Sequence, residues 1–112
     1  MFVEITFSVN VKCTLIILGQ LPVDPTTKQI PEGIEAQTLL VLEKIDLILT
    51  EAGSSRENVI QMRNYISNIH LWDKVNEVYT QFFRDHKPVR CLVPVGELHY
   101  GCLIEAECVA AM

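Results

Sequence analysis

The chain has 112 residues, of which 49% are hydrophobic and 21% are charged, and its formal net charge is −5 at pH 7. This composition is typical of a globular protein and excludes a disordered chain, while the negative charge disfavours binding to a nucleic-acid backbone. The length suits one domain and no linker-like stretch divides it, so we expect a single domain over residues 1–112.

The N-terminal third of the chain predicts two strands followed by a loop. Residues 2–9 alternate apolar and polar positions and residues 13–18 form an apolar run, which indicates two strands joined near Asn10. Residues 19–33 are rich in Gly, Pro, Asp and Thr, as loops are. At the start of this loop, Gly19 is expected to permit a close backbone approach or a bulge.

Helices and strands alternate in the middle of the chain. Apolar residues recur every three or four positions over 34–52, which predicts an amphipathic helix that ends with Gly53 as its cap. A strand is predicted over 58–67 and a second amphipathic helix over 72–84. The predicted buried stripes are Ile34, Thr38, Val41, Leu42, Ile45, Ile48, Leu49 and Ala52 in the first helix, and Trp72, Val75, Val78, Tyr79, Phe82 and Phe83 in the second.

Two further strands, at 90–95 and 102–111, complete a ββαβαββ order. This order predicts an α+β fold in which a mixed sheet carries both helices on one face. The other face then needs a cover, which the sheets of neighbouring subunits in a homo-oligomer would supply. A mean hydropathy of +0.24 also favours an oligomer, and clefts between its subunits would hold the chemistry.

Other features of the sequence bear on location and partners. The apolar runs are far shorter than the roughly 20 residues that a membrane-spanning helix needs, so no membrane association is expected. No signal-peptide pattern opens the chain, which predicts a cytoplasmic protein. The four cysteines have no CxxC spacing and the three histidines lie far apart, so we expect reduced thiols and no metal site.

Arg90 stands at the head of an otherwise apolar strand. Its guanidinium stays protonated and needs an anion if it is partly buried. One interpretation is an internal ion pair with Glu105, on a strand expected to run antiparallel beside it. The other is that Arg90 offers a bidentate fork to the carboxylate of a small ligand while Glu105 transfers a proton. The residues alone leave both interpretations open.

Three more residues near these strands could take part. Glu107 lies two positions after Glu105, so both side chains share one face of the strand. If that face is screened from water, the like charges raise the pKa of at least one of the two carboxyl groups; the alternative is an edge strand with solvated glutamates. Cys91 is either a reactive thiol beside Arg90 or a buried small hydrophobe. Asn76 is either a surface residue of the second helix or a side chain that fixes a ligand or a loop.

The segment PVRCLVPVGEL (88–98), followed by IEAEC (104–108), resembles the signature of the RidA family, also called the YjgF or L-PSP family. GQLPVDPTTKQIP (19–31) and WDKVNEVYTQFF (72–83) are similar to further parts of that pattern, and the resemblance covers roughly residues 15–110. It implies a chorismate-mutase-like fold, assembled as a homotrimer whose sheets pack inward and whose three clefts lie between subunits.

The resemblance also implies an activity. Characterised relatives deaminate reactive 2-imino acids or their enamine tautomers, such as 2-iminobutanoate and 2-iminopropanoate, to 2-oxo acids and ammonia, without cofactor or metal. By the same resemblance, Arg90 holds the substrate carboxylate and Glu105 positions or activates the attacking water. Gly19, Asn76 and Cys91 are then ligand-binding positions.

The chain departs from the family pattern at several places. Ile5 stands about where active relatives carry a tyrosine, Leu18 where they carry a serine, and Leu92 where many carry a cysteine. These changes predict weakened or altered deaminase activity. They also keep open a non-catalytic trimer that binds 2-oxo acids as a sensor or regulator. The endoribonuclease activity in the family's older name is disfavoured by the negative charge.

Overall fold

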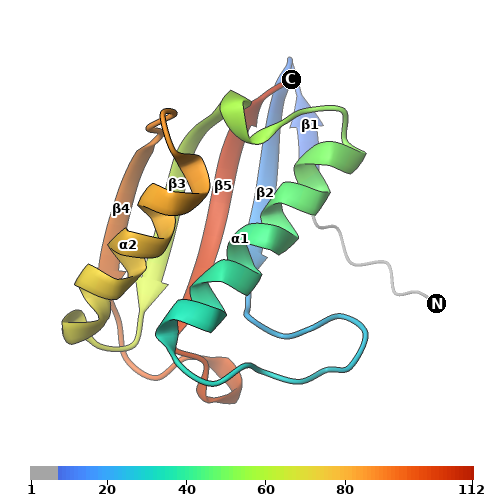
Figure 1. The fold of residues 1–112 in the computed structure, drawn as a ribbon. Coiled ribbons are helices and arrows are strands. Elements are labelled where there is room, and N and C mark those ends of the chain that lie inside the picture. The colour runs from blue at the N-terminus through green and yellow to red at the C-terminus, as the bar shows by residue number, and fades with distance from the viewer. Residues whose placement is uncertain (1–7) are drawn as a thin grey trace.

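The computed structural model describes residues 8–112, which form a five-stranded mixed sheet with two long helices on one face (Figure 1). The predicted ββαβαββ order and α+β class are confirmed. The strands are β1 Ser8–Val11, β2 Thr14–Gln20, β3 Val59–Ile66, β4 Val89–Pro94 and β5 Ile104–Ala111. The helices are α1 Ile34–Glu51 and α2 Trp72–Phe83, with 3-10 turns at Arg56–Asn58, Ile69–Leu71 and His99–Gly101.

The strands lie in the order β1-β2-β5-β3-β4, so β3 separates β4 from β5. All neighbouring strands are antiparallel except β3 and β4, which are parallel because α2 crosses over between them. The prediction that the strands of Arg90 and Glu105 lie side by side is therefore wrong. After the α2 crossover, β4 pairs with one side of β3 and forms the edge of the sheet, whereas β5 pairs with the other side of β3.

The β1–β2 hairpin turns two residues later than predicted. Asn10 continues β1 opposite Leu15, and the turn is made by Lys12 and Cys13, with φ angles of 50° and 66°. Two successive positive φ angles are typical of the hairpin turns that match the right-handed twist of the strands. Neither residue is a glycine, the residue that most often signals a positive φ angle, and the turn was therefore not predicted at this position. The predicted strand residues before Ser8 lie outside the part of the chain that the structure describes.

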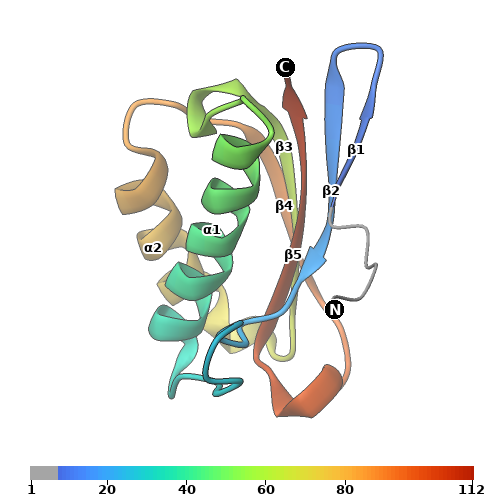
Figure 2. The same ribbon diagram turned by 90° about the vertical axis from the view of Figure 1, so that its right-hand side faces the viewer.

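Helix α1 packs its apolar stripe onto the sheet, and Figure 2 shows both helices on the same side of it. The C-terminal end forms as predicted: Gly53 has a φ of 87°, and the Ser54 N–H donates to the Leu49 carbonyl oxygen over 2.8 Å. Ile48 and Ala52 are only partly buried at the margin of the stripe. The buried residues of α1 are Ile34, Gln37, Thr38, Val41, Leu42, Ile45 and Leu49.

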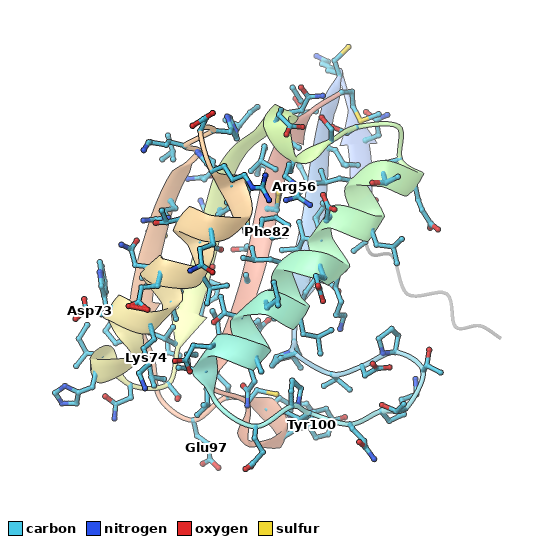
Figure 3. All side chains as sticks on the ribbon, viewed as in Figure 1. Arg56, Asp73, Lys74, Phe82, Glu97 and Tyr100 are labelled. Atoms are coloured by element: carbon cyan, nitrogen blue, oxygen red, sulfur yellow. The ribbon has the colours of Figure 1, made fainter. Side chains whose placement is uncertain are left out.

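Helix α2 buries Val75, Tyr79 and Phe83, which lie one turn apart. Trp72, predicted to be buried, is 42% exposed: its spacing fits the buried stripe, but it is the first residue of the helix and lies at the end of that stripe. Figure 3 shows Arg56 beside Phe82, where it links the two helices. Its guanidinium donates to the Phe82 carbonyl oxygen over 2.9 Å and pairs with the Asp46 carboxylate at 3.0 Å.

The sheet face opposite the helices carries exposed apolar side chains. Ile16 and Leu18 on β2 are 45% and 46% exposed, and Val93 on β4 is 39% exposed. Alternate residues of the same strands, Leu15, Ile17 and Leu92, face the core. We call this uncovered side the open face of the sheet. No helix within residues 8–112 is long and apolar enough to cross a bilayer.

Candidate active site

Arg90 lies on the edge strand β4, on the side of the sheet that carries the helices. Met62, its neighbour on β3, is fully buried, and Leu92 also faces the core. Because β4 forms the edge, the Arg90 side chain remains exposed beside α2. Its Nη2 group donates a hydrogen bond to Asn76 Oδ1, and its guanidinium carbon lies 5.1 Å from the centre of the Tyr79 ring. Helix α2 therefore orients the guanidinium through one amide and one aromatic face.

A buried polar chain fixes the backbone beside Arg90. Burial raises the pKa of Tyr79, so its hydroxyl stays protonated and donates to Asn64 Oδ1. Asn64, fully buried on β3, donates through Nδ2 to the Cys91 carbonyl oxygen over 3.0 Å. This link was not predicted, although an amide between Met62 and Ile66 on the core face of a strand is a signal for it.

Tyr79→Phe is expected to destabilise the protein by about 1–3 kcal/mol, because Asn64 Oδ1 would be left buried without a donor. Urea denaturation at fixed protein concentration measures this loss. Tyr65→Phe is the matched control, since the Tyr65 hydroxyl is only partly buried where it donates to Glu107. Equal stability losses in the two variants would show that the Tyr79–Asn64 link does not act as described.

Glu105 and Gly19 meet on the open face of the sheet. Ile104 and Ala106 face the core, so Glu105 between them points to the opposite side. A Cβ added at Gly19 would overlap Oε2 of Glu105 and lie 3.3 Å from its Cδ. The register between β2 and β5 shifts between Ile17 and Gln20, which is the irregularity expected at Gly19. The glycine thus leaves room for this carboxylate.

Glu107 has its own partners on the open face. It accepts a hydrogen bond of 2.7 Å from the Tyr65 hydroxyl, and its carboxylate lies 3.6 Å from Nη1 of Arg63. The hydrogen bond to Glu107 raises the pKa of Tyr65. Glu105 lies opposite Tyr65 on the neighbouring strand, so the two carboxylates share a face as predicted but have different surroundings.

The candidate residues therefore form two groups on opposite sides of the sheet. Arg90 and Asn76 lie on the helix side at the β4 edge, whereas Gly19 and Glu105 lie on the open face. The internal ion pair between Arg90 and Glu105 does not form among the described residues, because β3 separates their strands and the side chains point in opposite directions. Within one chain, Arg90 is left available to an external anion.

Two further positions bear on this site. Cys91 is exposed and alternates with Leu92, so its side chain lies on the open face rather than beside the Arg90 guanidinium. Trp72 lies one helical turn before Asn76, which places the exposed indole on the same side of α2 as the Arg90 contact. This aromatic residue was missed as a site candidate because its spacing also fits the buried stripe.

The described residues offer no grouped ligands for a metal. No three His, Cys, Asp or Glu side chains within residues 8–112 are arranged to hold an ion. The four cysteines are free thiols: Cys13 and Cys91 are exposed, and Cys102 and Cys108 are buried. Burial raises the pKa of Cys108 to about 12.

Comparison with known sequences gives consistent matches. The family model described as Endoribonuclease L-PSP matches residues 4–112. A RutC family protein of Pyrococcus abyssi is 40% identical over 97 residues, which cover 86% of this chain and 76% of the relative. TdcF of Escherichia coli, which is named as a reactive intermediate deaminase, is 37% identical over 95 residues, 82% of this chain and 74% of the relative.

Solved structures agree with these matches. E. coli TdcF with bound serine superposes with a TM-score of 0.92 at 31% identity, covering all of this chain and 91% of the other. RidA from the Antarctic bacterium Psychrobacter sp. PAMC 21119 gives 0.91 at 31% identity, covering 95% and 86%. In fold, signature segments and overall sequence, this chain belongs to the RidA (YjgF/L-PSP) family.

Proposed function

We propose that this protein is a homotrimeric deaminase that hydrolyses reactive 2-imino acids and their enamine tautomers to 2-oxo acids and ammonia. The observation that carries the proposal is the state of Arg90: it is exposed, oriented by Asn76 and Tyr79, and forms no ion pair with a carboxylate among the described residues. The name of E. coli TdcF as a reactive intermediate deaminase supports the same chemistry.

The two groups of site residues support an assembly in which subunits complete each other's sites. One chain holds Arg90 and Glu105 on opposite sides of its sheet, so a cleft between subunits would join the Arg90 of one to the Glu105 of the next. The exposed apolar residues Ile16, Leu18 and Val93 on the open face give a reason for sheets to pack inward. Sedimentation velocity measures whether the protein is a trimer.

The proposed chemistry needs orientation and one proton carrier. Arg90 binds the 2-carboxylate with parallel N–H donors, which places the electrophilic imine carbon near Glu105. As water adds to that carbon, Glu105 transfers a proton from the water oxygen to the imine nitrogen, which gives a carbinolamine. Glu105 then transfers the proton of the new hydroxyl group to the same nitrogen, while the C–N bond breaks, the carbonyl of the 2-oxo acid forms and ammonia leaves. Proton transfer by a positioned carboxylate contributes about 100- to 10,000-fold.

The test is a coupled assay in which threonine dehydratase or an amino-acid oxidase generates the imine. The expected result is that catalytic amounts of the protein accelerate formation of the 2-oxo acid and ammonia above the rate in buffer. A rate equal to that in buffer would remove the deaminase proposal. Calorimetric binding of 2-oxobutanoate with no turnover would instead support the non-catalytic sensor, which the available Arg90 guanidinium also fits.

Gly19→Ala is expected to lower kcat by up to about 100-fold while leaving stability nearly unchanged. The added methyl group overlaps only the end of the flexible Glu105 side chain, so the carboxylate moves and the fold does not. Kinetics and thermal denaturation measure the two effects. Gly96→Ala is the matched control, because a Cβ there meets no atom within 4 Å. An unchanged kcat in Gly19→Ala would contradict the role of Gly19 in positioning the Glu105 carboxylate.

A further inference from the structure

A small pocket of about 110 Å³ lies between the C-terminal half of α2 and the start of β4. Its walls include Tyr79 and Phe83 from the helix and Arg84, Lys87 and Arg90 from the segment that follows. Arg90 is thus shared: it contacts Asn76 and the Tyr79 ring, and it also forms one wall of this pocket.

The pocket concentrates positive charge in a chain whose net charge is −5. Arg84, Lys87 and Arg90 are all exposed, and none of them forms an ion pair within residues 8–112. Asp85, the acidic residue of the segment, is not among the lining residues. Three cations around one concave site repel each other, and a bound anion offsets this electrostatic repulsion. The arrangement therefore favours an anionic ligand.

The cationic segment is held in place by the core. A ring nitrogen of His86 lies 2.8 Å from the Val59 carbonyl oxygen, and the Phe83 ring packs 6.2 Å from the His86 ring, centre to centre. Arg84 has a φ of 55°, which ends α2 and turns the chain toward β4. The cations on either side of His86 are therefore attached to an anchored backbone.

We infer that this pocket binds a second acidic group of the ligand, so that the site prefers dianionic 2-imino and 2-oxo acids to monoanionic ones. The inference rests on the proposed function, in which Arg90 binds the 2-carboxylate. A distal carboxylate or a distal phosphonate has the required chemistry, since Arg84 and Lys87 each supply charge-assisted hydrogen bonds to either group.

Calorimetry with three acids tests the inference. 2-Oxobutanoate has one acidic group, whereas 2-oxoglutarate adds a carboxylate and 3-phosphonopyruvate adds a phosphonate. The expected result is at least one dianion that binds about tenfold more tightly than 2-oxobutanoate, the effect of one charge-assisted hydrogen bond near the surface. The dianion with the larger gain identifies the group that the pocket accepts.

Substitutions assign the preference to the pocket. In Lys87→Gln and Arg84→Gln, the ratio of dianion to 2-oxobutanoate affinity is expected to fall toward one. Lys12→Gln removes the same charge from the β1–β2 turn, at the opposite edge of the sheet from β4, and is expected to keep the wild-type ratio. Equal affinities for all three acids, or a ratio that survives both pocket substitutions, would overturn the inference and leave the proposed function standing. Failure of every acid to bind would overturn both.

Discussion

Glu105→Gln is expected to lower kcat about 100- to 10,000-fold, while 2-oxobutanoate still binds. The amide keeps the shape of the side chain beside Gly19 but accepts no proton from the attacking water. The coupled deaminase assay measures the loss of turnover, and calorimetry measures the retained affinity. A loss of turnover without a matching loss of binding is the result that distinguishes a proton carrier from a ligand-binding group.

Glu107→Gln is the matched control for this substitution. Glu107 lies on the same strand and face, but its carboxylate already accepts from the Tyr65 hydroxyl and lies near Arg63. We expect this variant to keep most of its activity. If both variants lose activity equally, the effect comes from the charge of the open face rather than from Glu105 itself.

Arg90→Lys is expected to weaken the binding of 2-oxobutanoate and to raise KM by about 10- to 100-fold, the effect of lost charge-assisted hydrogen bonds. Lysine keeps the charge but replaces the planar fork with one ammonium group, and it cannot both contact Asn76 and hold a carboxylate through two parallel donors. Calorimetry and the coupled assay measure both quantities.

Arg63→Lys provides the control for the same exchange of side chains. Arg63 is exposed on the open face and makes a long ion pair with Glu107, which a lysine can replace. It is expected to bind 2-oxobutanoate as the wild type does. Wild-type affinity in Arg90→Lys would contradict the assignment of Arg90 as the carboxylate-binding residue.

The fold could be predicted to a large extent because its signals are local. The apolar period of α1, the cap at Gly53 and the alternation in β5 each depend on residues close together in the chain. Arg90 could be singled out in the same way, since a permanent cation in an apolar strand needs an anion. Each of these interpretations needs only neighbours in sequence.

The remaining features depend on which strands and side chains meet. No local pattern in the sequence indicates that β3 lies between β4 and β5. An ion pair between Arg90 and Glu105 is therefore compatible with the sequence, and only the order of the strands excludes it within one chain. The same applies to Asn64, whose role depends on Tyr79 reaching it from α2. Trp72 was assigned to the buried stripe because periodicity shows which side of a helix faces the sheet. It does not show which residues at the end of the helix extend beyond the core.

The placement of Arg90 and Glu105 on opposite sides of the sheet has a consequence for mixed assemblies. An inactive Arg90→Ala chain still carries Glu105, and an inactive Glu105→Gln chain still carries Arg90. In the proposed homotrimer, co-refolding the two chains in equal amounts would pair an intact arginine with an intact glutamate at about one quarter of the intersubunit clefts if chains combine at random. Two inactive variants would then give a mixture with deaminase activity. The specific activity of this mixture would fall on dilution as the subunits dissociate.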